Sequence, residues 1–108
     1  NFQEFEPQYV PEGFNVEKVE EGEGAFRILY RNTSSQSWYY ISFSNKLSLF
    51  LVDSEDTTSY STKINNHNAT ILNKNGELRI IMTTDSSQYK LIGNISTEEG
   101  IKIFESIK

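Results

Sequence analysis

The sequence predicts a small α+β domain: an antiparallel sheet of about six strands with one C-terminal amphipathic helix packed on one face. Short runs that alternate apolar and polar residues fill most of positions 9–95, as half-buried strands do. Turn motifs such as Asn75-Gly76 separate these runs, which favours hairpins. The apolar period lengthens to that of a helix only at positions 96–108.

The 108 residues fit a single domain, 1–108. We expect a polar lead-in at 1–8, mostly antiparallel strands over 9–95 and a helix over 96–108. Aromatic residues make up 13% of the chain, so bulky rings can fill a core that is short of aliphatic residues. With no cysteine in the sequence, disulfides and thiolate zinc sites are excluded.

The first two strands are expected on either side of a glycine-rich turn at 20–24. Pro11 and Gly13 precede the first strand, since both residue types favour turns. Alternation in this strand predicts one face composed of Phe14, Val16, Lys18 and Glu20. In the second strand, at 25–31, one face carries Phe26, Ile28 and Tyr30, and the other carries Arg27, Leu29 and Arg31.

A third strand at 38–43 is rich in aromatic and β-branched residues, as strands prefer. One of its faces carries Tyr39, Ile41 and Phe43, and the other carries Trp38, Tyr40 and Ser42. Residues 47–52 fit either a strand or a short helical turn, and 53–59 read as a polar loop.

Four more strands complete the predicted sheet. They are expected at 60–64, 69–73, 78–83 and 88–92, with turns at 65–68, 75–76 and around 85–86.

The final helix carries a capping-box motif, in which the Ser96 hydroxyl accepts the Glu99 amide and the Glu99 carboxylate reaches back. Its apolar stripe comprises Ile101, Ile103, Phe104 and Ile107. Gly100 weakens an isolated helix by up to ~1 kcal/mol relative to alanine. We therefore expect packing on the sheet to hold the helix.

The net charge of −5 and the pI near 4.8 argue against a nucleic-acid partner, which needs a basic surface. No run approaches the ~20 apolar residues of a membrane helix, so this segment is not expected to span a bilayer. The chain starts at Asn1 rather than at methionine. We expect a targeting segment to have been removed. The sequence leaves open whether the full-length protein carries an N-terminal membrane anchor.

Catalytic chemistry finds little support. His67 is the only histidine and lies in an asparagine-rich turn, where we interpret it as a solvated turn residue. A serine-type nucleophile needs an adjacent base, so the sequence predicts a protein that is not an enzyme and takes no cofactor.

Asp53, Glu55 and Asp56 form the one compact carboxylate group. Calcium takes six or more oxygen ligands and the EF-hand spacing is missing. A solvated acidic loop is the preferred interpretation and no metal site is predicted, with weak calcium binding as the alternative.

Trp38 and Tyr40 are the candidate partner-binding residues. Two-residue periodicity puts both on one face of their strand. Either loops cover this face and the two rings only pack in the interior, or the rings form an exposed patch that binds a protein or peptide.

Three stretches carry a family resemblance: Tyr9-Val10-Pro11-Glu12-Gly13-Phe14; the middle, with Tyr30, 41–43 and Asp53-Ser54-Glu55; and the strand, glycine, capping box and helix at 89–107. Together they resemble a bacterial domain of unknown function, family 4367, over nearly the whole chain. Members often carry a tryptophan in the strand at 80–82, where this chain has Met82. The thioether of Met82 can still fill core space.

The resemblance implies an extracytoplasmic C-terminal domain of Gram-positive, membrane-anchored proteins, some of them anti-sigma-factor-like. By analogy it implies a non-catalytic sensing or interaction module whose partner is a protein or a cell-envelope component. The alternative is a small-ligand or lipid carrier of the envelope, and an envelope hydrolase is the least favoured reading. The family supplies no catalytic residues.

Overall fold

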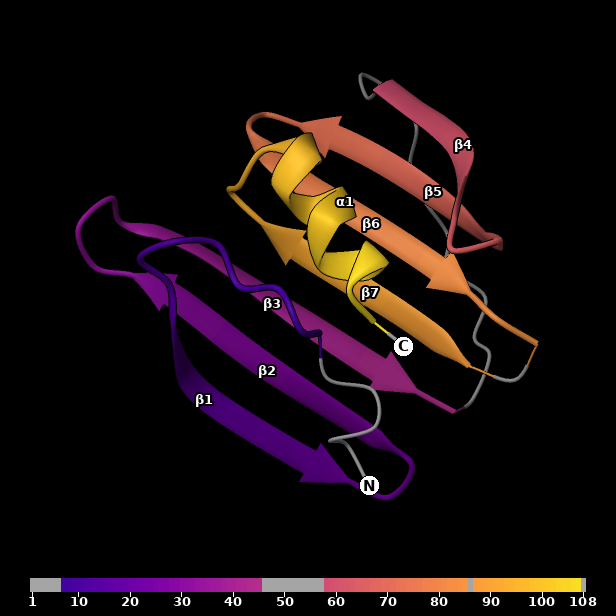
Figure 1. Cartoon of the computed structure of the whole chain (residues 1–108), viewed down its shortest axis with the longest axis horizontal. Coiled ribbons are helices and arrows are strands. Elements are labelled where there is room, and N and C mark those ends of the chain that lie inside the picture. Colours follow the sequence, from indigo (N-terminus) through magenta and orange to yellow (C-terminus); the bar gives the residue numbers. More distant parts are fainter. Residues whose placement is uncertain (1–6, 46–57, 86, 108) are drawn as a thin grey trace.

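A computed structural model describes residues 7–45, 58–85 and 87–107. These residues form one antiparallel sheet of seven strands and a single C-terminal helix (Figure 1). The strands are β1 (Asn15–Gly22), β2 (Ala25–Asn32), β3 (Ser37–Ser44), β4 (Thr58–Ile64), β5 (His67–Lys74), β6 (Glu77–Thr83) and β7 (Gln88–Gly93), and the helix is α1 (Thr97–Glu105). The sheet with one C-terminal helix is confirmed, in a mostly β chain with seven strands rather than about six.

The sheet consists of two meanders that join along β3 and β7. The strand order is β1-β2-β3-β7-β6-β5-β4, so the last strand in the chain lies in the middle of the sheet (Figure 1). Predictions for residues 47–52, for the acidic loop at 53–56 and for lead-in residues 1–6 lie outside the described residues.

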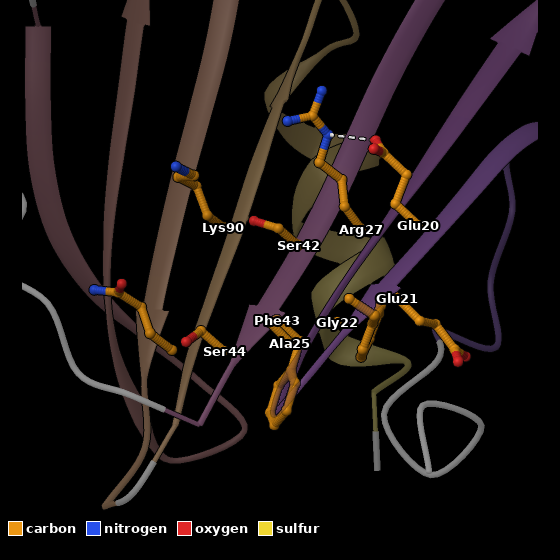
Figure 2. Close-up of a pocket in the computed structure, with 11 residues that line it drawn as sticks. Glu20, Glu21, Gly22, Ala25, Arg27, Ser42, Phe43, Ser44 and Lys90 are labelled. Atoms are coloured by element: carbon orange, nitrogen blue, oxygen red, sulfur yellow. Dashed lines mark ion pairs between the residues drawn. The ribbon is translucent and has the colours of Figure 1, made fainter.

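The predicted alternation of β1 is wrong beyond Val16. A register shift between Val16 and Lys18 puts Lys18 opposite Leu29 and Glu20 opposite Arg27, whereas Val16 pairs with Tyr30. One extra residue in a strand reverses the direction of every later side chain. Lys18 and Glu20 therefore lie on the face away from Val16, and Figure 2 shows Glu20 beside Arg27.

The β4–β5 hairpin is tighter than predicted. Asn65 and Asn66 both have positive φ, 52° and 69°, and they form the whole two-residue loop between β4 and β5. Asparagine tolerates this left-handed conformation better than most residues. His67, expected in the turn, is the first residue of β5 and pairs with Ile64. The Asn75-Gly76 hairpin is confirmed, with φ of 53° and 79°.

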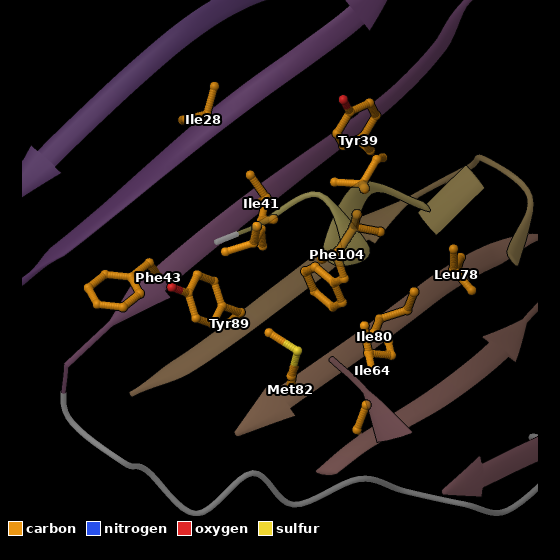
Figure 3. Close-up of a cluster of buried hydrophobic side chains, with 14 of the residues drawn as sticks. Ile28, Tyr39, Ile41, Phe43, Ile64, Leu78, Ile80, Met82, Tyr89 and Phe104 are labelled. Atoms are coloured by element: carbon orange, nitrogen blue, oxygen red, sulfur yellow. The ribbon is translucent and has the colours of Figure 1, made fainter. Parts of the chain in front are cut away.

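One face of the sheet carries the core (Figure 3). Its side chains come from alternate positions of the central strands and from the inner side of α1, as two-residue periodicity requires. The largest fully buried members are Tyr30, Tyr39, Phe104, Ile28, Ile41, Ile71, Leu78, Ile80, Met82, Leu91 and Ile103. We call this side, with α1 over β6 and β7, the helix face.

Both ends of α1 are capped by side chains. At its start the Ser96 hydroxyl accepts the Glu99 amide at 3.2 Å, as the capping motif predicts. The Glu99 carboxylate accepts a hydrogen bond from the Tyr9 hydroxyl at 2.7 Å. At the other end the Asn65 side-chain amide lies 3.1 Å from the Glu105 carbonyl and also contacts the carbonyls of Phe104 and Ile107. The β4–β5 turn thus satisfies carbonyls that a helix end leaves unpaired.

Gly100 has a packing role that offsets its low helix propensity. A Cβ at this position would lie 2.7 Å from Leu78 Cδ2 and 2.8 Å from Ile80 Cδ1. Only glycine lets the helix approach β6 this closely.

The N-terminal segment runs beside α1 on the helix face (Figure 1), whereas Val16 and Val19 of β1 and Tyr60 of β4 are exposed on the same face. The Ser106 hydroxyl accepts the amides of Gln8 and Tyr9, each at 3.0 Å. The Phe14 ring packs on Tyr39 with ring centroids 5.2 Å apart. Two segments from opposite ends of the chain therefore cover part of the helix face.

Candidate functional site

The face opposite α1, which we call the far face, carries the alternate positions of the same strands. Its central residues are Arg27, Leu29 and Arg31 of β2 and Trp38, Tyr40 and Ser42 of β3, which pair across the two strands. The predicted division of both strands into two faces is confirmed. Both candidate binding residues, Trp38 and Tyr40, therefore lie on the side away from the helix.

Trp38 and Tyr40 form a ring pair on the far face, near the start of β3. Their ring centroids are 6.5 Å apart and their planes differ by 18°. The Arg27 guanidinium carbon lies 4.5 Å from the centre of the Tyr40 ring, within the range of a cation–π contact. Both rings are partly exposed. They are thus ordered by their neighbours and still reachable from solvent.

Apolar side chains extend this ring pair across the sheet. Tyr40 pairs with Leu29 on one side and with Ile92 on the other, and both neighbours are partly exposed. Farther along, Leu72 and Ile81 also point to the far face and are only 3% and 8% exposed. The far face therefore has an apolar centre of its own, separate from the core beneath α1.

Positive charge is concentrated on the far face. By cross-strand register, seven of the eight described lysines and arginines belong to it; the exception is Lys102 on α1. The seven are Lys18, Arg27, Arg31, Lys63, Lys74, Arg79 and Lys90. Three carboxylates accompany them and form ion pairs: Glu17 with Arg31, Glu20 with Arg27, and Glu77 with Arg79. Counted over the described residues, the far face is net positive, in a chain of net charge −5.

A shallow hollow of about 430 Å³ lies at one end of the far face, over β1, β2, β3 and β7. Figure 2 shows Lys90, Ser42, Arg27 and Glu20 in one row across neighbouring strands. The edges of Phe26 and Phe43 contribute apolar surface to this hollow. Arg27 and Lys90 line the hollow together with the carboxylates of Glu20 and Glu21, so positive and negative side chains are balanced there.

Sequence reasoning missed this basic face because the total charge of the chain is negative. The signal is nevertheless present in the strands. In β2 and β6 the arginines occupy the positions that alternate with buried apolar residues. Joining β7 to β3 then places Lys90 and Ile92 beside Ser42 and Tyr40, a pairing that no local pattern encodes.

The remaining candidates lie elsewhere. His67 lines a second hollow, of about 330 Å³, with Asn65, Met82, Thr84, Tyr89 and Ile107. There the Thr84 hydroxyl is bonded to the backbone of Ser87. Within residues 7–45, 58–85 and 87–107, no three His, Asp or Glu side chains are grouped as metal ligands. No helix in the same ranges has the length and apolarity needed to cross a membrane.

The phenols near the core remain protonated at neutral pH. Burial raises the pKa of Tyr39 far above its usual value, with smaller contributions from Tyr30, Tyr9 and Glu99. Burial also raises the pKa of Tyr89 to about 12. The hydrogen bond to the Glu99 carboxylate raises the pKa of Tyr9. The Tyr39 hydroxyl is fully buried and has no hydrogen-bond partner within the described part of the chain.

A comparison with protein-family models gives a match over nearly the whole chain. A search of curated proteins found no similar sequence. The model of a family described as "Domain of unknown function (DUF4367)" matches residues 4–107, which include all seven strands and the helix. The chain therefore belongs to the DUF4367 family.

Proposed function

We propose that this domain is a non-catalytic binding module whose far face docks a protein or a component of the cell envelope. The observation that carries the proposal is the ring pair of Trp38 and Tyr40, partly exposed on a basic sheet face. Interface hot spots are enriched in tryptophan, tyrosine and arginine, and all three types are in contact here, because Arg27 lies over the Tyr40 ring and Tyr40 lies beside Trp38.

We further propose that the module works outside the cytoplasm, as a sensing or interaction part of a membrane-anchored regulator. The resemblance to extracytoplasmic C-terminal domains of Gram-positive proteins supports this location. A non-catalytic role is supported by the setting of His67, because the aliphatic hydroxyl in its hollow, that of Thr84, is engaged by Ser87. A general base needs hydrogen-bond reach of its nucleophile.

Binding to a washed envelope fraction from a Gram-positive bacterium tests the proposal. Trp38→Ala should weaken binding by ~2 kcal/mol or more, about thirtyfold, if the ring is an interface anchor. Tyr60→Ala is the matched control, because Tyr60 is 48% exposed and pairs with Ile71 of the helix face. Equal binding of wild type and Trp38→Ala would contradict the proposal.

Intrinsic fluorescence gives an independent check, since Trp38 is the only tryptophan. We expect emission that acrylamide quenches readily, because the ring is partly exposed. A blue-shifted emission protected from acrylamide would place Trp38 in a packed interior. The proposal of a binding site on the far face would then be wrong.

A small-ligand or lipid carrier is the second candidate function. The hollow of about 330 Å³ beside Ile107, with Met82 and Tyr89 in its wall, favours it. A fatty acid that binds there should raise the melting temperature, and Met82→Trp should abolish the shift by filling the hollow.

A further inference from the structure

The charges of the described residues are separated onto the two sides of the domain. Among these residues, seven cations and three carboxylates lie on the far face. The other described carboxylates lie on the helix face, on α1 or in loops: Glu12, Glu21, Glu23, Asp85, Glu98, Glu99 and Glu105. Such a molecule presents opposite signs to partners on its two sides.

Screening lets the far face act independently of the net charge. The shortest extent of the domain is 22 Å, and Figure 1 looks along this axis onto the sheet. At physiological ionic strength charges are screened over about 8 Å. Acidic groups on the helix side therefore do little to oppose an anion in contact with the far face.

The cations are spread too widely for a compact anion. Lys18 on β1 and Lys63 on β4 lie on opposite edge strands of the sheet. Six strand spacings of ~4.8 Å separate these edges by roughly 29 Å. A single phosphate or a short acidic peptide contacts only a few of these groups. An anionic surface meets many of them together, chiefly those on the central strands, because sheet twist turns the edges away.

The ring pair suits the polar–apolar boundary of a membrane. Tryptophan and tyrosine concentrate at membrane–water interfaces; Tyr40 lies between the partly exposed Leu29 and Ile92, and Trp38 pairs with Arg31. Basic residues near an anionic bilayer strengthen attachment. We infer that the far face binds an anionic lipid surface, with the ring pair at the headgroup level and the arginines beside it on the headgroups. This inference rests on the proposed function and identifies the envelope component.

Vesicles of phosphatidylglycerol and phosphatidylcholine test the inference with the whole chain. We expect co-sedimentation with phosphatidylglycerol-containing vesicles, weakening as salt rises, and little with phosphatidylcholine alone. Trp38 emission should shift to the blue on binding. Arg27→Gln combined with Arg31→Gln should weaken binding roughly thirtyfold, since each basic residue near the surface contributes ~1 kcal/mol.

The matched control is Lys102→Gln, which removes the one described cation outside the far face. Its affinity for vesicles should change less than twofold, and circular dichroism should show that all variants fold. Equal weakening by Lys102→Gln and by the double variant would overturn the inference, because attraction would then follow net charge alone.

Other outcomes separate the inference from the proposed function. If soluble polyglutamate or single-stranded DNA binds as tightly as anionic vesicles, the face recognises negative charge without a lipid surface and the inference fails. If vesicles do not bind even at low salt, the inference also fails. Binding to a lipid-extracted envelope fraction that Trp38→Ala abolishes would then leave the proposed function standing.

Discussion

The two faces of this sheet are built from the same strands and differ in almost every physical property. Along β3, Tyr39, Ile41 and Phe43 are buried toward α1, while Trp38, Tyr40 and Ser42 are only partly covered on the far side. α1 and the N-terminal segment cover part of the helix face, and seven of the eight described cations lie on the far face. In β2 and β3 one two-residue alternation separates buried from partly exposed side chains, whereas Leu72 and Ile81 are buried on the far face of β5 and β6.

The largest expected effect lies on the helix face. Phe104 is fully buried between α1 and the sheet, so Phe104→Ala should lower the free energy of unfolding by about 3–5 kcal/mol through lost burial and the cavity left behind. Urea denaturation measures the loss. A loss below ~1 kcal/mol would mean that packing of α1 on the helix face contributes little to stability. The two faces would then not differ in their contribution to stability.

Raising the pH tests the same face without a mutation. Burial raises the pKa of Tyr89 to about 12 from 10.0 and raises that of Tyr39 as well. Above pH 10 the unfolded chain loses phenolic protons that the folded chain keeps, so stability falls as pH rises. For Tyr89 alone the loss by pH 12 is on the order of 2 kcal/mol. Denaturation midpoints between pH 9 and pH 12 measure it.

Tyr89→Phe is the control for this titration. Phenylalanine keeps the ring and removes the ionising group, so the fall in stability between pH 10 and pH 12 should become shallower. An unchanged slope would show that Tyr89 ionises in the folded state as readily as in the unfolded one.

Several elements of the helix face were predictable because their signals are local. The alternation in β2 and β3, the Asn75-Gly76 turn and the Ser96 cap depend on residues close together in the sequence. The β1 bulge was not predictable, since one inserted residue leaves no compositional trace and yet reverses Lys18 and Glu20. The contact of Tyr9 with Glu99 joins the two ends of the chain, and local periodicity carries no information about it.

The far face was predictable only in part. Period-two alternation placed Trp38 and Tyr40 together, and the structure agrees. The surrounding basic surface depends on β7 pairing with β3 rather than only with its neighbour in the chain, β6. Net charge, the quantity first available from a sequence, averages over both faces and hides their opposite signs.

A smaller effect is expected at the C-terminal end of α1. Asn65→Gly keeps the positive φ of the turn and removes the amide that contacts the carbonyls of Phe104, Glu105 and Ile107. We expect a loss of about 1 kcal/mol, typical of a net hydrogen-bond contribution. Asn66→Gly, in the same turn with φ of 69°, should change stability by only a few tenths of a kcal/mol. Equal losses would assign the effect to the turn rather than to the helix cap.

The smallest expected effect on stability belongs to the far face. Trp38 lies on the side of β3 away from the core, and its ring contacts Tyr40 on the same strand. Trp38→Ala should therefore lower the free energy of unfolding by about 0.5 kcal/mol, in the range of surface substitutions, while Tyr39→Ala on the next position should cost about 3–5 kcal/mol as a buried aromatic. Thermal and urea denaturation of the two variants measure both losses in the free energy of unfolding, and so give their ratio. Comparable losses would mean that the far face is a second core, and the aromatic pair would then be part of the fold rather than a surface for a partner.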